Sequence, residues 1–580
     1  MPIKLTRKPR KHDPEADTIY PFTDIAVSLS GGGFRASAYS LGCLSYLQRR
    51  SYNGLPLLER VKFITSASGG TLTSLLFSAY NHLGIPFTEV YNRLRKEILI
   101  EDKLLKDAAE IIADDAQWSE NSGKSRNTIN AFAKAFQHKV FDNLEFGVFW
   151  AGKGTLEEVC FNTSELENGR TFRFQTDGDN ATEEIIGNPY LCIRSKNIRG
   201  IKKIALGDIM AASACYPAGF EPMVFPDDFV RYPMHQQDLK DALVKAVNHN
   251  WSDYEPYTKS FVIMDGGITD NQGIESLRLA NKRRMKKNKR GFDTVLICDV
   301  ANYFLEPFEP LHEETTWWSR ISMYNIISIH KYAPFIFAAA VAMIFTTRFS
   351  GLGWVLATVS SLMFATFMLG TYLMSRTPDP VGSMNMFNVP LGVFMNYFLK
   401  SPISRTGLMI KARWRSTMRV GMEIYDIHLR RVNYEAFYMD PDWVGKAKSV
   451  SIYELSKGNE HVFQRLMTAK DFDAETKELL TPSEAIKSVA EYARRMGTTL
   501  WFSKDDMTNE KNILDALIAC GQFTMCYNLL EYIIELEADY PAVKEDSVIQ
   551  CLKTELLHDW KLFQVNPKFM VIDFMAATGG

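Results

Sequence analysis

The stretch IAVSLSGGGFRA, at residues 25–36, joins a short apolar run to three successive glycines and an arginine. The run Ile25–Leu29 favours a strand, and the pattern of Ala36–Gln48 predicts a helix after it. Glycine lets a backbone approach a ligand closely, and the helix directs its positive end at the same point. Such a turn binds a phosphate or an oxyanion that develops during a reaction.

Three more apolar runs predict buried strands, at Val61–Thr65, Phe261–Met264 and Thr294–Val300. A second helical pattern, Leu72–Tyr80, follows the first of these runs. Repeated strand–glycine–helix units predict a parallel α/β sheet with both faces covered by helices. Chemistry in such sheets gathers at the carboxyl ends of the strands, so we expect the glycine clusters to meet at one edge.

The sequence TSASGGT, at residues 65–71, follows the second strand directly. It is close to the G-x-S-x-G nucleophile elbow, in which a serine occupies a sharp turn between a strand and a helix. Ser68 is the central serine and Gly70 the trailing glycine, while Ser66 replaces the leading glycine. The position of Ser66 requires a small side chain, and serine is nearly small enough.

The sequence MDGGITDN, at residues 264–271, places Asp265 at the end of a strand, before two glycines. A carboxylate there can reach a serine on a neighbouring strand, although a lone turn aspartate more often bonds its own backbone. Gly31–Ala36 also fits a dinucleotide-binding loop, but no acidic residue ends an evident second strand about 20 residues later.

The three motifs, in this order, resemble the patatin-like phospholipase family, and ASACYPAGFEP at 212–222 resembles the block before its aspartate. Ala36 stands where the family often has glycine. The resemblance implies a three-layer α/β sandwich around a mostly parallel sheet. It also implies a nucleophile, Ser68; a proton acceptor, Asp265; an oxyanion hole of Gly31, Gly32, Gly33 and Gly69; and supporting residues Arg35, Gly70, Gly266 and Gly267.

The resemblance further implies a lipid acyl hydrolase of the phospholipase A or lysophospholipase type, which acts on membrane phospholipid or lysophospholipid without cofactor or metal. The family's dyad contains no histidine. A Ser-His-Asp triad that uses His312 or His428 is the alternative within this chemistry. Two other functions stay open: a latent effector that a signal activates to degrade membranes, and a non-catalytic lipid-binding scaffold.

The middle of the chain contains two uncharged apolar stretches, Tyr332–Thr347 and Leu352–Met374, separated by Arg348. A helix that spans a bilayer needs about 20 apolar residues, so residues 326–376 predict an inserted transmembrane hairpin. Two spans return the chain to one side, and the flanking Lys331 and Arg376 favour the cytoplasmic side for the catalytic domain. A buried hairpin in a soluble domain is the alternative.

The remaining boundaries follow from these segments. We predict a basic arm at 1–20, the first part of the catalytic core at 21–312, and the rest of the catalytic fold with helices at 421–532. A helical tail follows at 533–580. The segment 385–420 is apolar, aromatic and basic, which predicts either an amphipathic element on anionic headgroups or a core helix with a basic face.

The composition limits the remaining classes of function. The chain has 580 residues, 46% of them hydrophobic, and a formal net charge of -2. This balance gives no sign of nucleic-acid binding. Its eight cysteines form no CxxC pair and are typical of buried thiols. An oligomeric state cannot be derived from these patterns.

Overall fold

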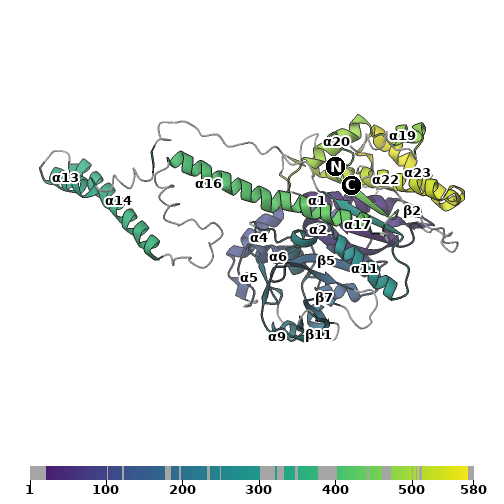
Figure 1. Cartoon of the computed structure of the whole chain (residues 1–580), viewed down its shortest axis with the longest axis horizontal. Coiled ribbons are helices and arrows are strands. Elements are labelled where there is room, and N and C mark those ends of the chain that lie inside the picture. The colour runs from purple at the N-terminus through teal and green to yellow at the C-terminus, as the bar shows by residue number, and fades with distance from the viewer. Residues whose placement is uncertain are drawn as a thin grey trace. The chain divides into compact units, whose positions relative to one another are not determined.

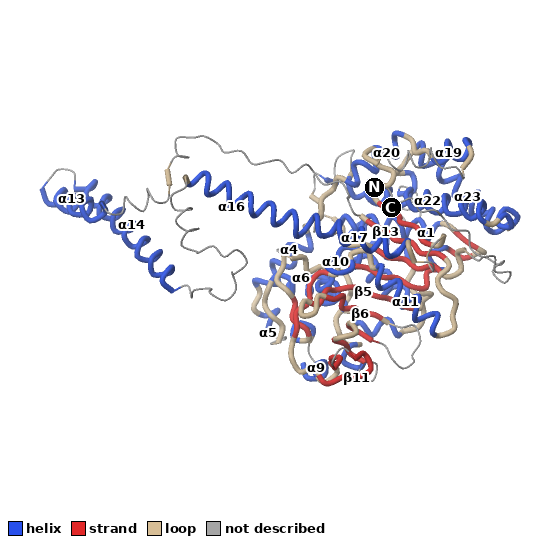
Figure 2. Tube along the Cα trace, viewed as in Figure 1, coloured by secondary structure: helices blue, strands red, loops and turns tan. Residues whose placement is uncertain are grey.

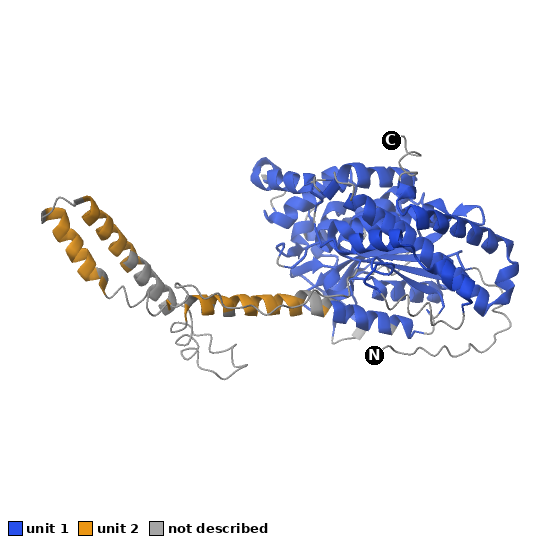
Figure 3. Cartoon of the chain, turned by 90° about the horizontal axis from the view of Figure 1, so that it is seen from above, with its two compact units in different colours: residues 1–304, 426–580 blue, residues 305–425 orange. Residues whose placement is uncertain are grey.

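The computed structural model describes residues 21–571 except 101, 120–122, 177–184, 195–197, 218, 231–235, 248–249, 301–320, 323–331, 347–349, 377–401, 441–442, 444, 460–471, 500, 504–505 and 508–511. The predicted basic arm, His312 and the first part of the 385–420 segment lie outside this range. The chain forms two compact units (Figure 3). Unit 1 combines residues 1–304 and 426–580, and unit 2 is residues 305–425.

A twelve-stranded mixed sheet forms the centre of unit 1 (Figure 2). One side of it, up to the edge strand β14, is parallel, in the order β5-β4-β1-β13-β14. These strands are β1 (Ile25–Leu29), β4 (Val61–Ala67), β5 (Glu158–Glu165), β13 (Thr294–Asp299) and β14 (Ala447–Ser451). Three of them confirm predicted strands, whereas β14 comes from the region after unit 2, where no strand was predicted and a mostly helical part of the catalytic fold was expected.

Antiparallel strands extend the sheet beyond β5. They are β6 (Arg170–Gln175), β7 (Ile185–Gly187), β8 (Leu191–Arg194), β10 (Leu243–Val247) and β11 (Asn250–Pro256), with β9 (Met223–Phe225) and β12 (Phe261–Asp265) off this path. The prediction that Phe261–Met264 is a parallel strand was wrong, because β12 runs antiparallel to β5 and β9. A short apolar run does not encode strand direction, which pairing with distant strands sets.

Helices cover both faces of the sheet (Figure 1), because alternate residues of its strands enter two separate cores. In β1, Val27 packs with α1 and α2, whereas Ala26 packs with α11 and α17. The predicted three-layer sandwich is therefore present. The helices concerned are α1 (Gly33–Arg49), α2 (Ser68–Leu83), α8 (Leu206–Ser213), α11 (Ile274–Lys286) and α17 (Tyr425–Tyr438). Others in the first half are α3 (Phe87–Arg93), α4 (Lys103–Ala113) and α6 (Thr128–Lys139).

The helix α22 (Ile513–Asp539) packs along α1 with unusually close backbones. A Cβ added at Gly42 would lie 2.1 Å from the carbonyl oxygen of Ile518, and one at Gly521 would lie 2.2 Å from that of Tyr39. The C-terminal region is therefore part of the core of unit 1. It also contains α19 (Ala474–Leu480), α20 (Glu484–Arg494) and α23 (Ser547–Val565).

Unit 2 contains α13 (Ala333–Thr346), α14 (Ser350–Arg376) and α16 (Ile403–Met418), which a π-helical turn, η9 (Arg419–Ile424), extends. The backbones of α13 and α14 are in contact, since a Cβ at Gly353 would lie 2.8 Å from the carbonyl oxygen of Ala340. Within the described residues, the only helix long and apolar enough to cross a membrane is α22, and 94% of its apolar window is buried. Pro334–Phe345 and Gly351–Leu362 are shorter apolar helices, so the two-span hairpin stays a prediction.

Candidate active site

A strained turn joins β4 to α2. Ala67 ends the strand in an extended conformation, and Ser68 begins the helix with φ at 49°. Positive φ is uncommon for residues other than glycine and costs free energy that the surrounding packing must offset. The nucleophile elbow of serine hydrolases has the same sharp strand-to-helix turn with serine at its apex.

The residues after Ser68 are small because α2 starts against the glycine-rich loop. A Cβ at Gly69 would lie 1.9 Å from the carbonyl oxygen of Gly33, and one at Gly70 would lie 2.5 Å from that of Ser30. No side chain fits at either position without separating the two segments.

Ser66, which occupies the leading position of the elbow, is buried at the start of α2. Its Oγ lies 3.0 Å from Thr71 Oγ1 and 2.5 Å from Ser74 Oγ. The serine that replaces the expected glycine is therefore accommodated by hydroxyl groups of the following helix.

Asp265 ends β12, a strand that approaches the Ser68 elbow from the direction opposite to β4. One edge of β5 pairs first with β4, which ends where Ala67 aligns with Asn162. The same edge then pairs with β12, whose last residue, Asp265, aligns with Thr163. The two strands thus converge end to end, one residue apart along β5, or about 3.3 Å. The prediction that the motifs meet at one edge holds, although antiparallel pairing brings the aspartate there.

The Asp265 carboxylate is nearly enclosed, with 4% of the residue exposed. Its Oδ1 accepts a hydrogen bond of 2.6 Å from the Gly267 N–H, and its own N–H donates to the carbonyl of Cys215 at 3.0 Å. Burial, and then the charge of Asp265, raise the pKa of the Cys215 thiol to about 12. A Cβ at Gly266 would lie 2.2 Å from the carbonyl oxygen of Asn162, so this turn also requires glycine.

The three glycines of the loop differ in backbone conformation and in the hydrogen bonds of their N–H groups. The Gly31 N–H donates to Asn271, to Oδ1 at 2.9 Å and to the backbone oxygen at 3.2 Å. Gly32 and Gly33 have φ of 144° and 66°, which favour glycine. No hydrogen bond of the described chain uses the N–H groups of Gly32, Gly33 or Gly69. These three donors lie at the first turns of α1 and α2, where an anion would be stabilised.

Asn271 is a site residue to which the motifs gave no role, although it ends the quoted stretch MDGGITDN. A Cβ at Gly31 would lie 2.3 Å from Asn271 Oδ1 and 2.9 Å from the Cβ of Ser68. A Cβ at Gly267 would lie 3.0 Å from the same Oδ1 and 2.9 Å from Asp265 Oδ1. The Asn271 amide therefore fastens the glycine-rich loop to the aspartate loop, beside both catalytic candidates.

Ser213 is a second residue that sequence reasoning missed, although it lies in the quoted block 212–222. Its Oγ accepts a hydrogen bond of 3.0 Å from the Ser68 N–H and donates one of 2.7 Å to the carbonyl of Asn162. Its carbonyl accepts the Gly266 N–H at 3.2 Å. One buried hydroxyl residue at the end of α8 thus connects the elbow, β5 and the aspartate turn.

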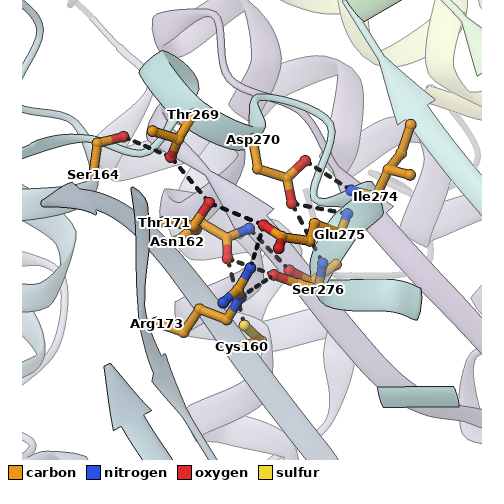
Figure 4. A network of polar contacts seen from close by, with 11 residues as sticks. Cys160, Asn162, Ser164, Thr171, Arg173, Thr269, Asp270, Ile274, Glu275 and Ser276 are labelled. Carbon is orange, nitrogen blue, oxygen red and sulfur yellow. Dashed lines mark hydrogen bonds and ion pairs between the residues drawn. The ribbon is translucent and has the colours of Figure 1, made fainter. Parts of the chain in front are cut away.

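A buried polar network anchors the segment that follows Asp265 (Figure 4). Asp270 accepts the N–H groups of Ile274 and Glu275 at 2.9 and 3.0 Å and so caps α11. Arg173 of β6 binds Glu275 at 2.6 Å and Ser276 Oγ at 2.9 Å. Burial raises the pKa of Asp270 to about 6, although the Arg173 charge opposes the shift.

The C-terminal region holds the glycine-rich loop from outside. Arg35 donates a 2.6 Å hydrogen bond to the carbonyl of Met496, and the Phe34 N–H donates one of 2.7 Å to the carbonyl of Thr499. The rings of Phe34 and Phe502 lie 6.2 Å apart. Arg35 therefore connects the glycine-rich loop to the C-terminal region through the Met496 carbonyl.

Two alternatives lie away from this site. His428 is exposed on α17, and no described contact joins it to Ser68 or Asp265. A surface cavity of about 360 Å³ is lined by Asn81, Gly84 and neighbours at the carboxyl end of α2, whereas Ser68 begins that helix. The cavity thus does not belong to the candidate active site.

Comparison with known proteins places these features in a family. The model of the family "Patatin-like phospholipase" matches residues 27–278, while no curated protein matches the chain. Human GIVD cytosolic phospholipase A2 is similar at 13% identity and a TM-score of 0.30, over 48% of this chain and 43% of that one. VipD from Legionella pneumophila is similar at 10% identity and a TM-score of 0.22, over 93% and 90% of the two chains. This chain thus spans less than half the length of the phospholipase A2. The family match, together with the three motifs, shows that the chain carries a patatin-like phospholipase domain at residues 27–278.

Proposed function

We propose that the chain is a membrane-anchored lipid acyl hydrolase of the phospholipase A or lysophospholipase type that uses a Ser68–Asp265 dyad. The patatin-like phospholipase domain supports a lipid-ester hydrolase. The observation that carries the dyad is the end-to-end convergence of β4 and β12 on β5, which brings the elbow serine and the buried aspartate together.

In the first half of the reaction, Ser68 Oγ attacks the carbonyl carbon of the ester while Asp265 accepts its proton. The N–H groups of Gly32, Gly33 and Gly69 stabilise the negative charge on the carbonyl oxygen, and each such donor contributes about 10²–10³ in rate. Gly31 has a different part from the one expected, because its N–H is already bonded to Asn271. When the tetrahedral intermediate collapses, the alcohol leaves with the proton from Asp265.

In the second half, water attacks the acyl-enzyme at the same carbonyl carbon. Asp265 now accepts a proton from the water, and the same three N–H groups stabilise the second oxyanion. Ser68 leaves with the proton that Asp265 holds, and the free fatty acid is released. The dyad is then in its starting state, and no metal or cofactor enters the cycle.

The membrane anchor of the proposal is the α13–α14 pair. Its outer face is apolar and exposed, with 63% of Trp354, 66% of Leu362 and 81% of Phe345 accessible. Two spans would return the chain to the side it left, which lets residues 426–580 complete the catalytic unit. The flanking Lys331 and Arg376 favour the cytoplasmic face for that unit.

The test is fatty-acid release from mixed phospholipid and lysophospholipid vesicles by the detergent-solubilised full chain. We expect Ser68→Ala to lower kcat/KM by about 10⁴-fold or more, and Asp265→Asn to have a similar effect. Labelling by a fluorophosphonate, which reacts with activated serines, should vanish with Ser68→Ala.

Two variants serve as matched controls. Ser78→Ala removes another buried hydroxyl from α2 and should leave activity unchanged. His428→Ala removes the histidine of the alternative triad and should also be silent. Wild-type activity in Ser68→Ala would contradict the assigned nucleophile, and a loss of about 10⁴-fold in His428→Ala would establish a triad in place of the dyad.

A further inference from the structure

The helix α16 and the turn η9 carry a stripe of exposed apolar residues. Ile410 is 59% exposed, Trp414 is 64% exposed and Tyr425, directly after η9, is 49% exposed. Successive α-helical residues are separated by about 100°, so Gly407, Ile410 and Trp414 lie on one face. The π-helical turn η9 leaves Gly421 and Tyr425 close to this face, whereas Val420, 57% exposed, lies off it. Exposed aromatic and aliphatic side chains in a continuous line indicate a binding surface.

Basic residues border this stripe. Lys411 and Arg415 follow its residues by one position on one side, and Arg413 lies on the other side. Together α16 and η9, residues 403–424, contain five basic residues and one acidic residue, Glu423. An apolar face with basic borders is the composition of helices that lie in the plane of an anionic membrane.

The other basic run of the chain, Lys282–Arg290, has different surroundings. Arg283 binds Glu158 at 2.8 Å, Arg284 binds Asp24 and Glu157 at 2.8 Å, and Arg290 binds Asp293 at 2.7 Å. These four carboxylates, all in unit 1, pair with four of the seven basic residues of the run, Lys289 included, and no apolar stripe accompanies it. It therefore lacks the combination that α16 presents.

We propose that α16 lies along the surface of a bilayer that contains anionic lipids. Its stripe, defined as Gly407, Ile410, Trp414, Gly421 and Tyr425, enters the boundary of the acyl chains, and its basic residues contact the headgroups. The proposal rests on the proposed function in taking bilayer lipid as the substrate, and it adds a preference for anionic membranes. A second copy of the helix is a poorer partner, because pairing two stripes would bring like-charged borders together.

The test measures the depth of four single positions on α16, in the full chain with Ser68→Ala so that no lipid is consumed. Gly407→Cys and Ile410→Cys place a thiol on the stripe, and Ala412→Cys and Ser416→Cys place one on the opposite, exposed face. Cys551→Ser removes the one exposed native thiol among the described cysteines. A Cβ at Gly407 meets no atom within 4 Å, so this label should not disturb the fold.

Each thiol carries an environment-sensitive fluorophore, and the protein is mixed with vesicles that are either zwitterionic or about one-third anionic. With anionic vesicles we expect a blue shift and quenching by spin-labelled acyl chains at 407 and 410, but at neither 412 nor 416. Lys411→Gln together with Arg415→Gln should lower the binding constant for anionic vesicles about 30-fold, from about fivefold per charge. Lys282→Gln with Lys286→Gln, which removes the same charge from α11, should change nothing.

Three outcomes would overturn the proposal. Equal exposure of all four labels to water with anionic vesicles would show that α16 does not touch lipid. Protection at 407 and 410 that needs no vesicles and grows with protein concentration would assign the stripe to a second copy. Equal quenching with zwitterionic vesicles would remove the role of the basic borders. Because no outcome depends on hydrolysis, failure here leaves the dyad untouched, and failure of the dyad leaves this surface testable.

Discussion

Two apolar helices of equal length have opposite surroundings in this chain. α22 and α14 are both 27 residues long. α22 is enclosed in unit 1, where most of its polar side chains are paired: Gln522 Nε2 with Ser45 at 3.0 Å, Asn528 with Glu454 at 2.7 Å, and Glu531 with Lys448 at 3.0 Å. Gln522 Oε1 is buried without a partner among the described residues. α14 has no charged residue before Arg376, and its outer side chains are exposed.

The difference shows what apolar composition alone leaves open. A buried helix inside a protein retains polar groups mostly where partners exist for them, as along α22. The described outer face of α14 is mostly apolar, with Thr358 and Ser361 as exposed hydroxyl residues, and water is a poor surrounding for so much apolar surface. Hydropathy finds both helices, but their polar residues distinguish a helix that holds a fold together from one suited to lipid.

The largest expected effect comes from replacing a glycine at which α22 contacts α1. Gly521→Val places atoms against the carbonyl of Tyr39, so α22 must separate from α1, and we expect unit 1 to lose about 3 kcal/mol or more of unfolding free energy. Gly351→Val in α14 meets no atom within 4 Å and should stay within about 0.5 kcal/mol. Urea unfolding in detergent, followed by activity, measures both. Equal losses would show that α14 is packed as tightly as α22.

A smaller effect should follow a charge on the outer face of α14. Leu362→Arg places a guanidinium near the middle of the predicted second span, which costs about 2.5–3.5 kcal/mol of insertion free energy. We expect the protein to move from the carbonate-resistant membrane pellet to the supernatant, with ester hydrolysis in detergent unchanged. Leu562→Arg, on the exposed surface of α23, should leave the distribution unaltered. Full membrane retention of Leu362→Arg would contradict the span.

The sequence predicted much of the catalytic edge but little of its support. β1, β4, β13 and the elbow at Ser68 follow from local patterns, because apolar runs and glycine turns are encoded within a few residues. The antiparallel direction of β12 and the strand β14 depend on partners far along the chain. For the same reason the polar links made by Ser213 and Asn271 escaped notice, since a single serine or asparagine carries no periodic signal.

A pH-dependent effect tests the paired interior of unit 1 at an enclosed carboxylate, Asp270. Asp270 has a pKa of about 6 in the folded protein, above its ordinary value of 3.8, because burial disfavours its charge. Between these pH values the folded chain keeps a proton that the unfolded chain releases. Asp270 therefore lowers stability as pH rises from about 4 to about 6, by at most about 1.4 kcal/mol per pH unit. Asp270→Asn removes this slope while it keeps an oxygen that can cap α11.

The measurement is the unfolding free energy of both proteins from pH 4 to 7, compared as a difference so that all other carboxylates cancel. The unfolding free energy of Asp270→Asn relative to that of wild type should rise up to about pH 6 and then stay level. Asp473→Asn is the matched control, because Asp473 also caps a helix but is exposed, and its bond from the Thr476 N–H lowers its pKa. Its titration window lies below its ordinary value of 3.8, so its difference should stay nearly level from pH 4 to 7. Parallel curves for wild type and Asp270→Asn would contradict this prediction. They would mean that Asp270 is already ionised at pH 4 in the folded protein, and that its partners in unit 1 stabilise its charge despite burial, as partners stabilise polar groups of α22.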